Sequence, residues 1–87
     1  MNKKEQLLDC FDTAMRFLQE FMGVKIQTPN GLHEIIVFKR ENYASKRDYY
    51  CNFYNDNLEL LANKKVKIVD YCCANDMESI QLELWDE

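Results

Sequence analysis

Apolar residues recur along the first 22 positions with the period of an α-helix. The main stripe advances by alternating steps of four and three residues, which places its members on one helical face: Leu7, Phe11, Ala14, Leu18 and Phe21. Gly23 follows in the manner of a left-handed helix stop. The sequence therefore predicts a helix over 3–22, and the rest of the chain has to supply a surface that covers its apolar face.

The next segment predicts a β-hairpin. Val24 and Ile26 alternate with polar residues, as in a half-buried strand, and 29–31 reads Pro-Asn-Gly, a sequence typical of a hairpin loop. The run 35–38 that follows is apolar on both faces and mostly β-branched. It predicts a strand in the centre of a sheet.

Residues 41–65 support two interpretations. Aromatic residues over 47–54 favour a strand, and the asparagines within 52–57 are weak helix formers. We therefore expect a strand over 47–54 and a short helix over 56–63. The alternative is a single helix over 45–62, because the aromatic residues also fit a helical spacing.

The last third predicts a second hairpin. Val66 and Ile68 alternate with polar residues before a turn at 74–76, and Ile80, Leu82 and Leu84 alternate after it. The sum is one compact α+β domain over 1–87, in which the N-terminal helix packs on an antiparallel sheet of about five strands. A chain of 87 residues buries roughly 60–65% of its unfolded surface, which is enough for one thin core.

The cysteines and the single histidine do not form a recognisable reactive site. Cys72 and Cys73 are consecutive in the predicted strand, so their side chains point to opposite faces and do not close on one metal ion. The sequence has no CxxC pair, and both glycines are explained by a helix end and a turn. We expect no enzyme activity, no cofactor and no metal, with the cysteines acting as small core residues.

Two further features bear on where the chain acts. It has no apolar run of about 18 residues, and acidic residues interrupt its first dozen positions, so neither a membrane span nor a signal peptide is expected. We expect a cytoplasmic protein with reduced thiols.

Charge is distributed unevenly along the chain. Residues 1–38 carry four bases and five acids, and residues 39–67 carry seven bases and four acids. Residues 68–87 carry six acids and no base, which accounts for the net charge of −4. The C-terminal part is therefore the acidic pole of the molecule, and a basic partner would be steered towards it.

A partner-binding surface is predicted at this acidic pole. In the predicted last strand, Trp85 lies on the face opposite Ile80, Leu82 and Leu84, among carboxylates. Tryptophan is enriched among residues that contribute most to binding, although it also serves to cover a sheet edge. The candidate partner-binding residues are Trp85, Glu83, Glu87, Glu78, Asp76, Asp70 and Tyr71.

The basic segment 39–50 supports an alternative function. Bases interleaved with tyrosines resemble a platform on which single-stranded nucleic acid stacks, and the candidate residues are Lys39, Arg40, Lys46, Arg47 and Tyr49. A lysine-rich loop beside core tyrosines explains the same pattern, and Glu41 and Asp48 dilute its charge. A further alternative is a regulatory homo-oligomer, in which the basic middle of one subunit meets the acidic end of another. For the chain itself we expect a monomer or a homodimer.

These features favour a small acidic interaction or inhibitor module that binds a basic surface of a partner protein. In compactness, acidity and lack of a catalytic signature, the chain is similar to the small acidic proteins of phages and mobile elements that block host defence nucleases, anti-CRISPR proteins among them. The similarity is one of general character and not of any motif. It implies a nucleic-acid-binding enzyme as the partner.

Overall fold

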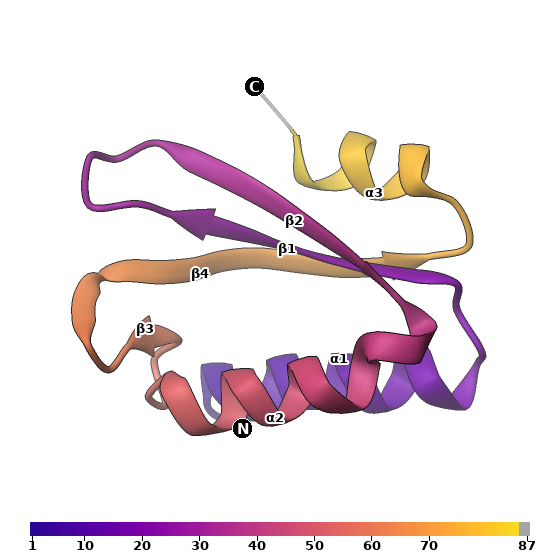
Figure 1. The fold of residues 1–87 in the computed structure, drawn as a ribbon, viewed down its shortest axis with the longest axis horizontal. Coiled ribbons are helices and arrows are strands. Elements are labelled where there is room, and N and C mark those ends of the chain that lie inside the picture. Colours follow the sequence, from indigo (N-terminus) through magenta and orange to yellow (C-terminus); the bar gives the residue numbers. More distant parts are fainter. Residues whose placement is uncertain (86–87) are drawn as a thin grey trace.

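The fold has three layers, built on a four-stranded antiparallel sheet (Figure 1). The computed structural model describes residues 1–85. Helices α1 (Lys3–Arg16) and α2 (Tyr43–Phe53) cover one face of the sheet, and α3 (Met77–Leu84) lies on the other. The strands are β1 (Phe21–Gln27), β2 (His33–Lys39), β3 (Glu59–Leu60) and β4 (Asn63–Ala74), in the order β2-β1-β4-β3. The predicted α+β class is confirmed, with four strands where about five were expected.

Helix α1 begins as predicted but ends six residues earlier. Asn2 and Glu5 form a capping box, in which each side chain accepts a hydrogen bond from the other residue's backbone N–H. At the far end Leu18 adopts a left-handed backbone with φ of 54°, and Gln19 N–H donates to the Ala14 carbonyl oxygen. Leu18 is thus the residue that stops the helix, and Phe21 already pairs in the sheet.

Gly23 has a different role from the predicted helix stop. It lies inside β1, where Ile80 and Leu84 of α3 pack on the sheet and are fully buried. A Cβ atom at position 23 would lie 2.5 Å from Cγ2 of Ile80 and 3.1 Å from Cδ1 of Leu84. The missing side chain therefore allows α3 to approach the sheet.

Segment 41–65 follows neither predicted interpretation in full. A 3₁₀ turn (Arg40–Asn42) leads into α2, so the strand over 47–54 was wrong, and the alternative helix ends at Phe53 and not at Ala62. The expected helix over 56–63 is also absent from the described structure. The side-chain oxygen of Asn55 accepts hydrogen bonds from Asn57 N–H and Glu59 N–H, which folds these residues into a turn before β3.

The last third is a strand followed by a helix. β4 is the long strand expected from the alternation at 66–68, but 77–84 is α3, so the second predicted hairpin was wrong. Asp76 caps α3 by accepting hydrogen bonds from Ser79 N–H at 2.7 Å and from Ser79 Oγ at 3.0 Å. Ile80 and Leu84, one helical turn apart, are buried, whereas Leu82 is 74% exposed.

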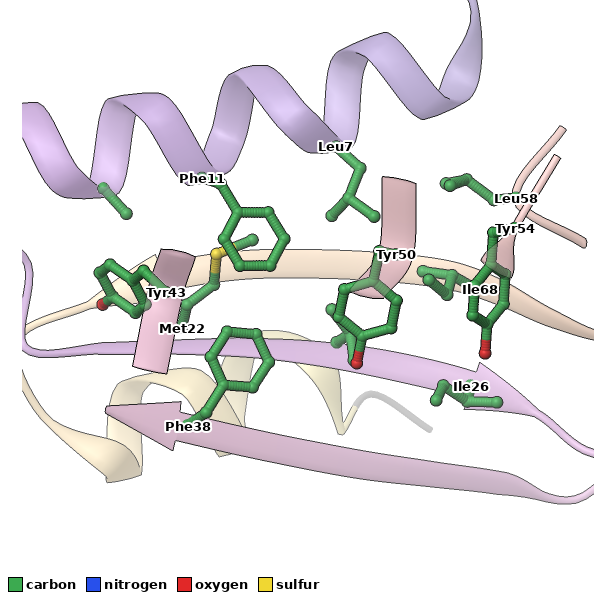
Figure 2. Packing of buried hydrophobic residues seen from close by; sticks show 12 residues of the cluster. Leu7, Phe11, Met22, Ile26, Phe38, Tyr43, Tyr50, Tyr54, Leu58 and Ile68 are labelled. Atoms are coloured by element: carbon green, nitrogen blue, oxygen red, sulfur yellow. The ribbon is translucent and has the colours of Figure 1, made fainter. Parts of the chain in front are cut away.

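An aromatic cluster between the α1–α2 layer and the sheet forms the centre of the core (Figure 2). The Phe11 ring of α1 stacks on Phe38 of β2 with centroids 5.6 Å apart and an interplanar angle of 9°. Tyr43 and Tyr50 of α2 contact both phenylalanine rings. Because all three elements meet at Phe11, this residue joins α1 to the sheet and to α2.

Burial of titratable groups in this core predicts a loss of stability at high pH. Burial raises the pKa of the Cys10 thiol and the Tyr43 hydroxyl, each to about 12. The unfolded chain releases these protons at lower pH than the folded chain does, so the contribution to stability is complete below about pH 9 and declines as the pH rises towards about 12. We expect the denaturation midpoint to fall over this range, and Tyr43→Phe to reduce the fall. A midpoint that stays constant up to pH 11 contradicts the prediction.

Candidate protein-interaction site

An open groove lies between α3 and strand β2, on the sheet face opposite α1 and α2. It has a volume of about 610 Å³ and is lined by Ile35, Val37, Glu78, Gln81, Leu82 and Trp85. We call it the β2–α3 groove. Its apolar residues come from both elements, and Leu82 and Trp85 are 74% and 60% exposed. A groove that combines exposed apolar side chains with few polar ones is suited to binding another molecule.

The register of α3 explains why these side chains face the groove. The buried pair Ile80 and Leu84 fixes the side of the helix that packs on Gly23. Gln81, Leu82 and Trp85 follow Glu78 by three, four and seven positions, so the three groove residues of α3 share a neighbouring face of the helix and Trp85 comes directly after its end. The same close approach at Gly23 thus sets the width of the groove.

The charged residue that lines the groove is acidic. Glu78 lines the groove and none of the lining residues is basic. The carboxylate of Glu83 acts on Cys72, whose pKa is raised to about 11 by burial first and then by Glu83 and Asp70. Lys25, on the same face of the sheet, is only 8% exposed and stands opposite Asp70 in the β1–β4 register. The two charged side chains of α3 itself, Glu78 and Glu83, are thus exposed and acidic, whereas Lys39 is exposed at the end of β2 on the same face as Ile35 and Val37.

The structure brings together only part of the predicted partner-binding set. Trp85 and Glu78 meet in the β2–α3 groove. Glu83 is exposed on α3 without lining the groove, and the Asp76 carboxylate is occupied in capping the helix. Glu87 lies outside the described residues.

The two predicted residues on β4 are separated from the groove. Tyr71 pairs with Val24 and packs against the core on the α1 side of the sheet, and burial raises its pKa. Asp70 is exposed and accepts a hydrogen bond from the Tyr71 backbone N–H at 2.8 Å. Tyr71 therefore does not extend the surface that carries Trp85.

Four groove residues were missed by the sequence analysis. Gln81 and Leu82 were placed on a strand, and Ile35 and Val37 were placed in a central strand. That second placement was wrong, because β2 is an edge strand. The run 35–38 is apolar on both faces because one face meets α1 and α2 and the other borders α3. An apolar run of this kind in the sequence indicates a strand that is covered on both faces, but it does not indicate whether the strand lies at the centre or at the edge of the sheet.

The basic segment does not form a continuous cationic surface. Arg40 pairs with Glu20, and Arg47 donates to both carboxylate oxygens of Asp12 at 3.0 and 3.2 Å. Tyr49 is 44% exposed and packs beside Phe53, with ring centroids 5.0 Å apart. Two of the four candidate bases are thus already paired with carboxylates, which lowers the attraction of this segment for phosphates.

The cysteines lie as the alternation predicted. Cys73 pairs with Met22 on the core face and Cys72 pairs with Gly23 on the α3 face, and all four thiols are free. Within residues 1–85 no three His, Cys, Asp or Glu side chains gather into a group that could hold a metal ion. None of the helices in this range is long and apolar enough to cross a membrane.

Comparison of the chain with protein-family models, curated proteins and solved structures finds no match. The β2–α3 groove and the acidic residues of α3 are therefore the features that indicate a function.

Proposed function

We propose that this chain is a cytoplasmic, non-enzymatic interaction module that binds a basic surface of a partner protein through the β2–α3 groove. The observation that carries the proposal is the exposed indole of Trp85 beside Leu82 and Glu78 in one open groove. A few residues supply most of the binding energy at protein interfaces, tryptophan is enriched among them, and acids at the rim steer a basic partner and set its orientation.

A nucleic-acid-binding enzyme is the partner class that best fits this chemistry. Such enzymes carry clusters of Lys and Arg that bind phosphates, and an acidic module is attracted to the same clusters. Occupation of them would exclude nucleic acid from the enzyme. The chain would then act as an inhibitor, in the manner of the phage and mobile-element proteins that it resembles in general character.

The proposal is tested by affinity capture of host proteins with matched variants. Trp85→Ala removes the aromatic contact and Glu78→Lys reverses the charge in the groove, and we expect each to weaken capture of the partner by about tenfold or more. Asp48→Lys is the control, because it makes the same charge change at an exposed position on α2, on the other side of the sheet. Capture should also weaken as salt concentration rises.

Two outcomes contradict the proposal. Equal capture by the wild type, Trp85→Ala and Glu78→Lys would mean that the groove does not bind the partner. A gel shift of single-stranded nucleic acid that disappears in a Lys39→Ala, Lys46→Ala double variant would instead assign function to the basic segment.

A further inference from the structure

The free edge of β2 presents backbone hydrogen-bonding groups at the border of the groove. In an antiparallel ladder, residues alternate between those bonded to the neighbouring strand and those facing away from it. β1 and β2 pair in one continuous register, and a backbone hydrogen bond joins the two segments at each end of it. At one end Arg40 N–H donates to the Glu20 carbonyl oxygen, and at the other Thr28 N–H donates to the Leu32 carbonyl oxygen. The alternation between these ends directs the N–H and C=O groups of Ile35 and Val37 away from β1, towards the free edge.

Ile35 and Val37 also line the groove with their side chains. The same two residues therefore offer backbone groups at the edge and apolar contacts beside it. Ile36, between them, is bonded to β1 and projects to the other face. Among residues 1–85, no other segment pairs with the outer edge of β2.

The opposite edge of the sheet is protected over residues 63–71. β3 pairs with the first part of β4, and Leu58 O accepts a hydrogen bond from Ile68 N–H at 2.9 Å. Beyond it the β1–β4 register shifts so that Val69 is left unpaired, and Asp70 accepts the Tyr71 N–H. Bulges and side-chain acceptors of this kind prevent a strand from pairing with another chain. β2 has neither device over 35–38, where the side chains are uncharged.

We propose that β2 accepts an extended segment of the partner protein as a fifth strand, and that this segment is basic with apolar residues at alternate positions. This inference rests on the proposed function and specifies how the groove binds. Residues of the added strand that stand opposite Ile35 and Val37 direct their side chains to the same face, towards Leu82 and Trp85. Basic residues at the intervening positions direct their side chains to the other face of the sheet, where β2 exposes the carboxylate of Glu34. A second copy of this chain is the less suitable occupant, because it would bring two copies of each carboxylate together.

The test uses a capped heptapeptide of alternating Lys and Val as the probe and the same peptide with Glu in place of Lys as its control. Hydrogen exchange followed by NMR reads out the geometry. In the free protein the amides of Ile35 and Val37 should exchange rapidly while that of Ile36 is slow. Saturating Lys–Val peptide should slow the exchange at 35 and 37 by about tenfold or more, and the Glu–Val peptide should bind about tenfold more weakly.

A backbone modification separates strand addition from side-chain contact. A protein assembled by chemical ligation with an N-methyl group on Val37 keeps the isopropyl group in the groove but loses the donor at the edge, so its affinity for the Lys–Val peptide should fall about tenfold. The same modification at Cys73, whose N–H faces the free edge of β4 by the same alternation, should leave the affinity unchanged.

Three results overturn the inference. The first is that the N-methyl-Val37 protein binds the Lys–Val peptide as tightly as the unmodified protein, and the second is that no saturable binding occurs at millimolar peptide. The third is that the Ile35 and Val37 amides become protected from exchange as the protein concentration rises without peptide, which would assign the edge to a second copy. The proposed function is tested separately by the captured partner. Capture that is lost in Trp85→Ala but kept in the N-methyl-Val37 protein leaves the proposed function standing and excludes strand addition.

Discussion

Phe11→Ala is expected to destabilise the fold by about 3–5 kcal/mol, the range observed for truncation of fully buried phenylalanines. The Phe11 side chain is completely buried and contacts Phe38, Tyr43 and Tyr50. Its removal leaves a cavity at the point where α1, α2 and β2 meet. Domains of this size are stable by about 5–15 kcal/mol, so the variant should lie near the limit of folding.

Chemical denaturation followed by circular dichroism measures the effect. Phe53→Ala is the matched control, because it removes the same side chain at a position that is 53% exposed, where the ring packs beside Tyr49. We expect the control to cost about 1 kcal/mol or less. Similar losses for the two variants would show that the aromatic cluster around Phe11 is not the main source of stability.

The elements that are determined by local signals could be predicted from the sequence. The start of α1 depends on the adjacent residues Asn2 and Glu5, and the first hairpin depends on a turn in which Gly31 adopts a φ of 81°. In both cases residues close in sequence decide the backbone conformation. The end of α1 was misplaced because Leu18, a residue that seldom adopts a left-handed backbone, stops the helix.

The C-terminal helix was missed because its pattern fits two periods. Ile80, Leu82 and Leu84 alternate as in a strand, but Ile80 and Leu84 are also one helical turn apart, and tertiary packing on Gly23 selects the helix. The Asp76–Ser79 pair at the start was the available local signal for a helix cap. Without the position of Gly23 in the sheet, the sequence alone does not distinguish the two.

The candidate site was predicted in part for a reason that proved wrong. Trp85 is exposed, as expected, but because it follows α3 and not because it lies on the outer face of a strand. The acidic character of residues 68–85 is a property of composition and is therefore independent of secondary structure. The contribution of β2 depends on strand order, which no local pattern encodes, so the groove itself could be found only in the structure.

Gly23→Val is expected to displace α3 from the sheet and to destabilise the protein by about 3 kcal/mol. Even a single Cβ at this position would meet Ile80 Cγ2 at 2.5 Å, and Ile80 is too rigid at χ1 to move its methyl group away. The loss should greatly exceed the small gain, about 0.5–1 kcal/mol, from replacing glycine in a strand. Trp85, the only tryptophan, follows α3 directly, so its fluorescence reports the displacement.

A double-mutant cycle with Ile80→Ala distinguishes the steric clash from a general disturbance of β1. Ile80→Ala removes the methyl group that a side chain at position 23 would meet, so Gly23→Ala should cost much less in that background than in the wild type. A coupling energy of about 1 kcal/mol or more is expected. Additive losses would mean that glycine is required for the backbone of β1 and not for the approach of α3.

Gly23→Val should also abolish binding of the Lys–Val peptide, because the contact at Gly23 positions the groove residues of α3. Gly31→Ala is the control and should retain binding, because it alters the hairpin loop, where a Cβ would meet nothing within 4 Å.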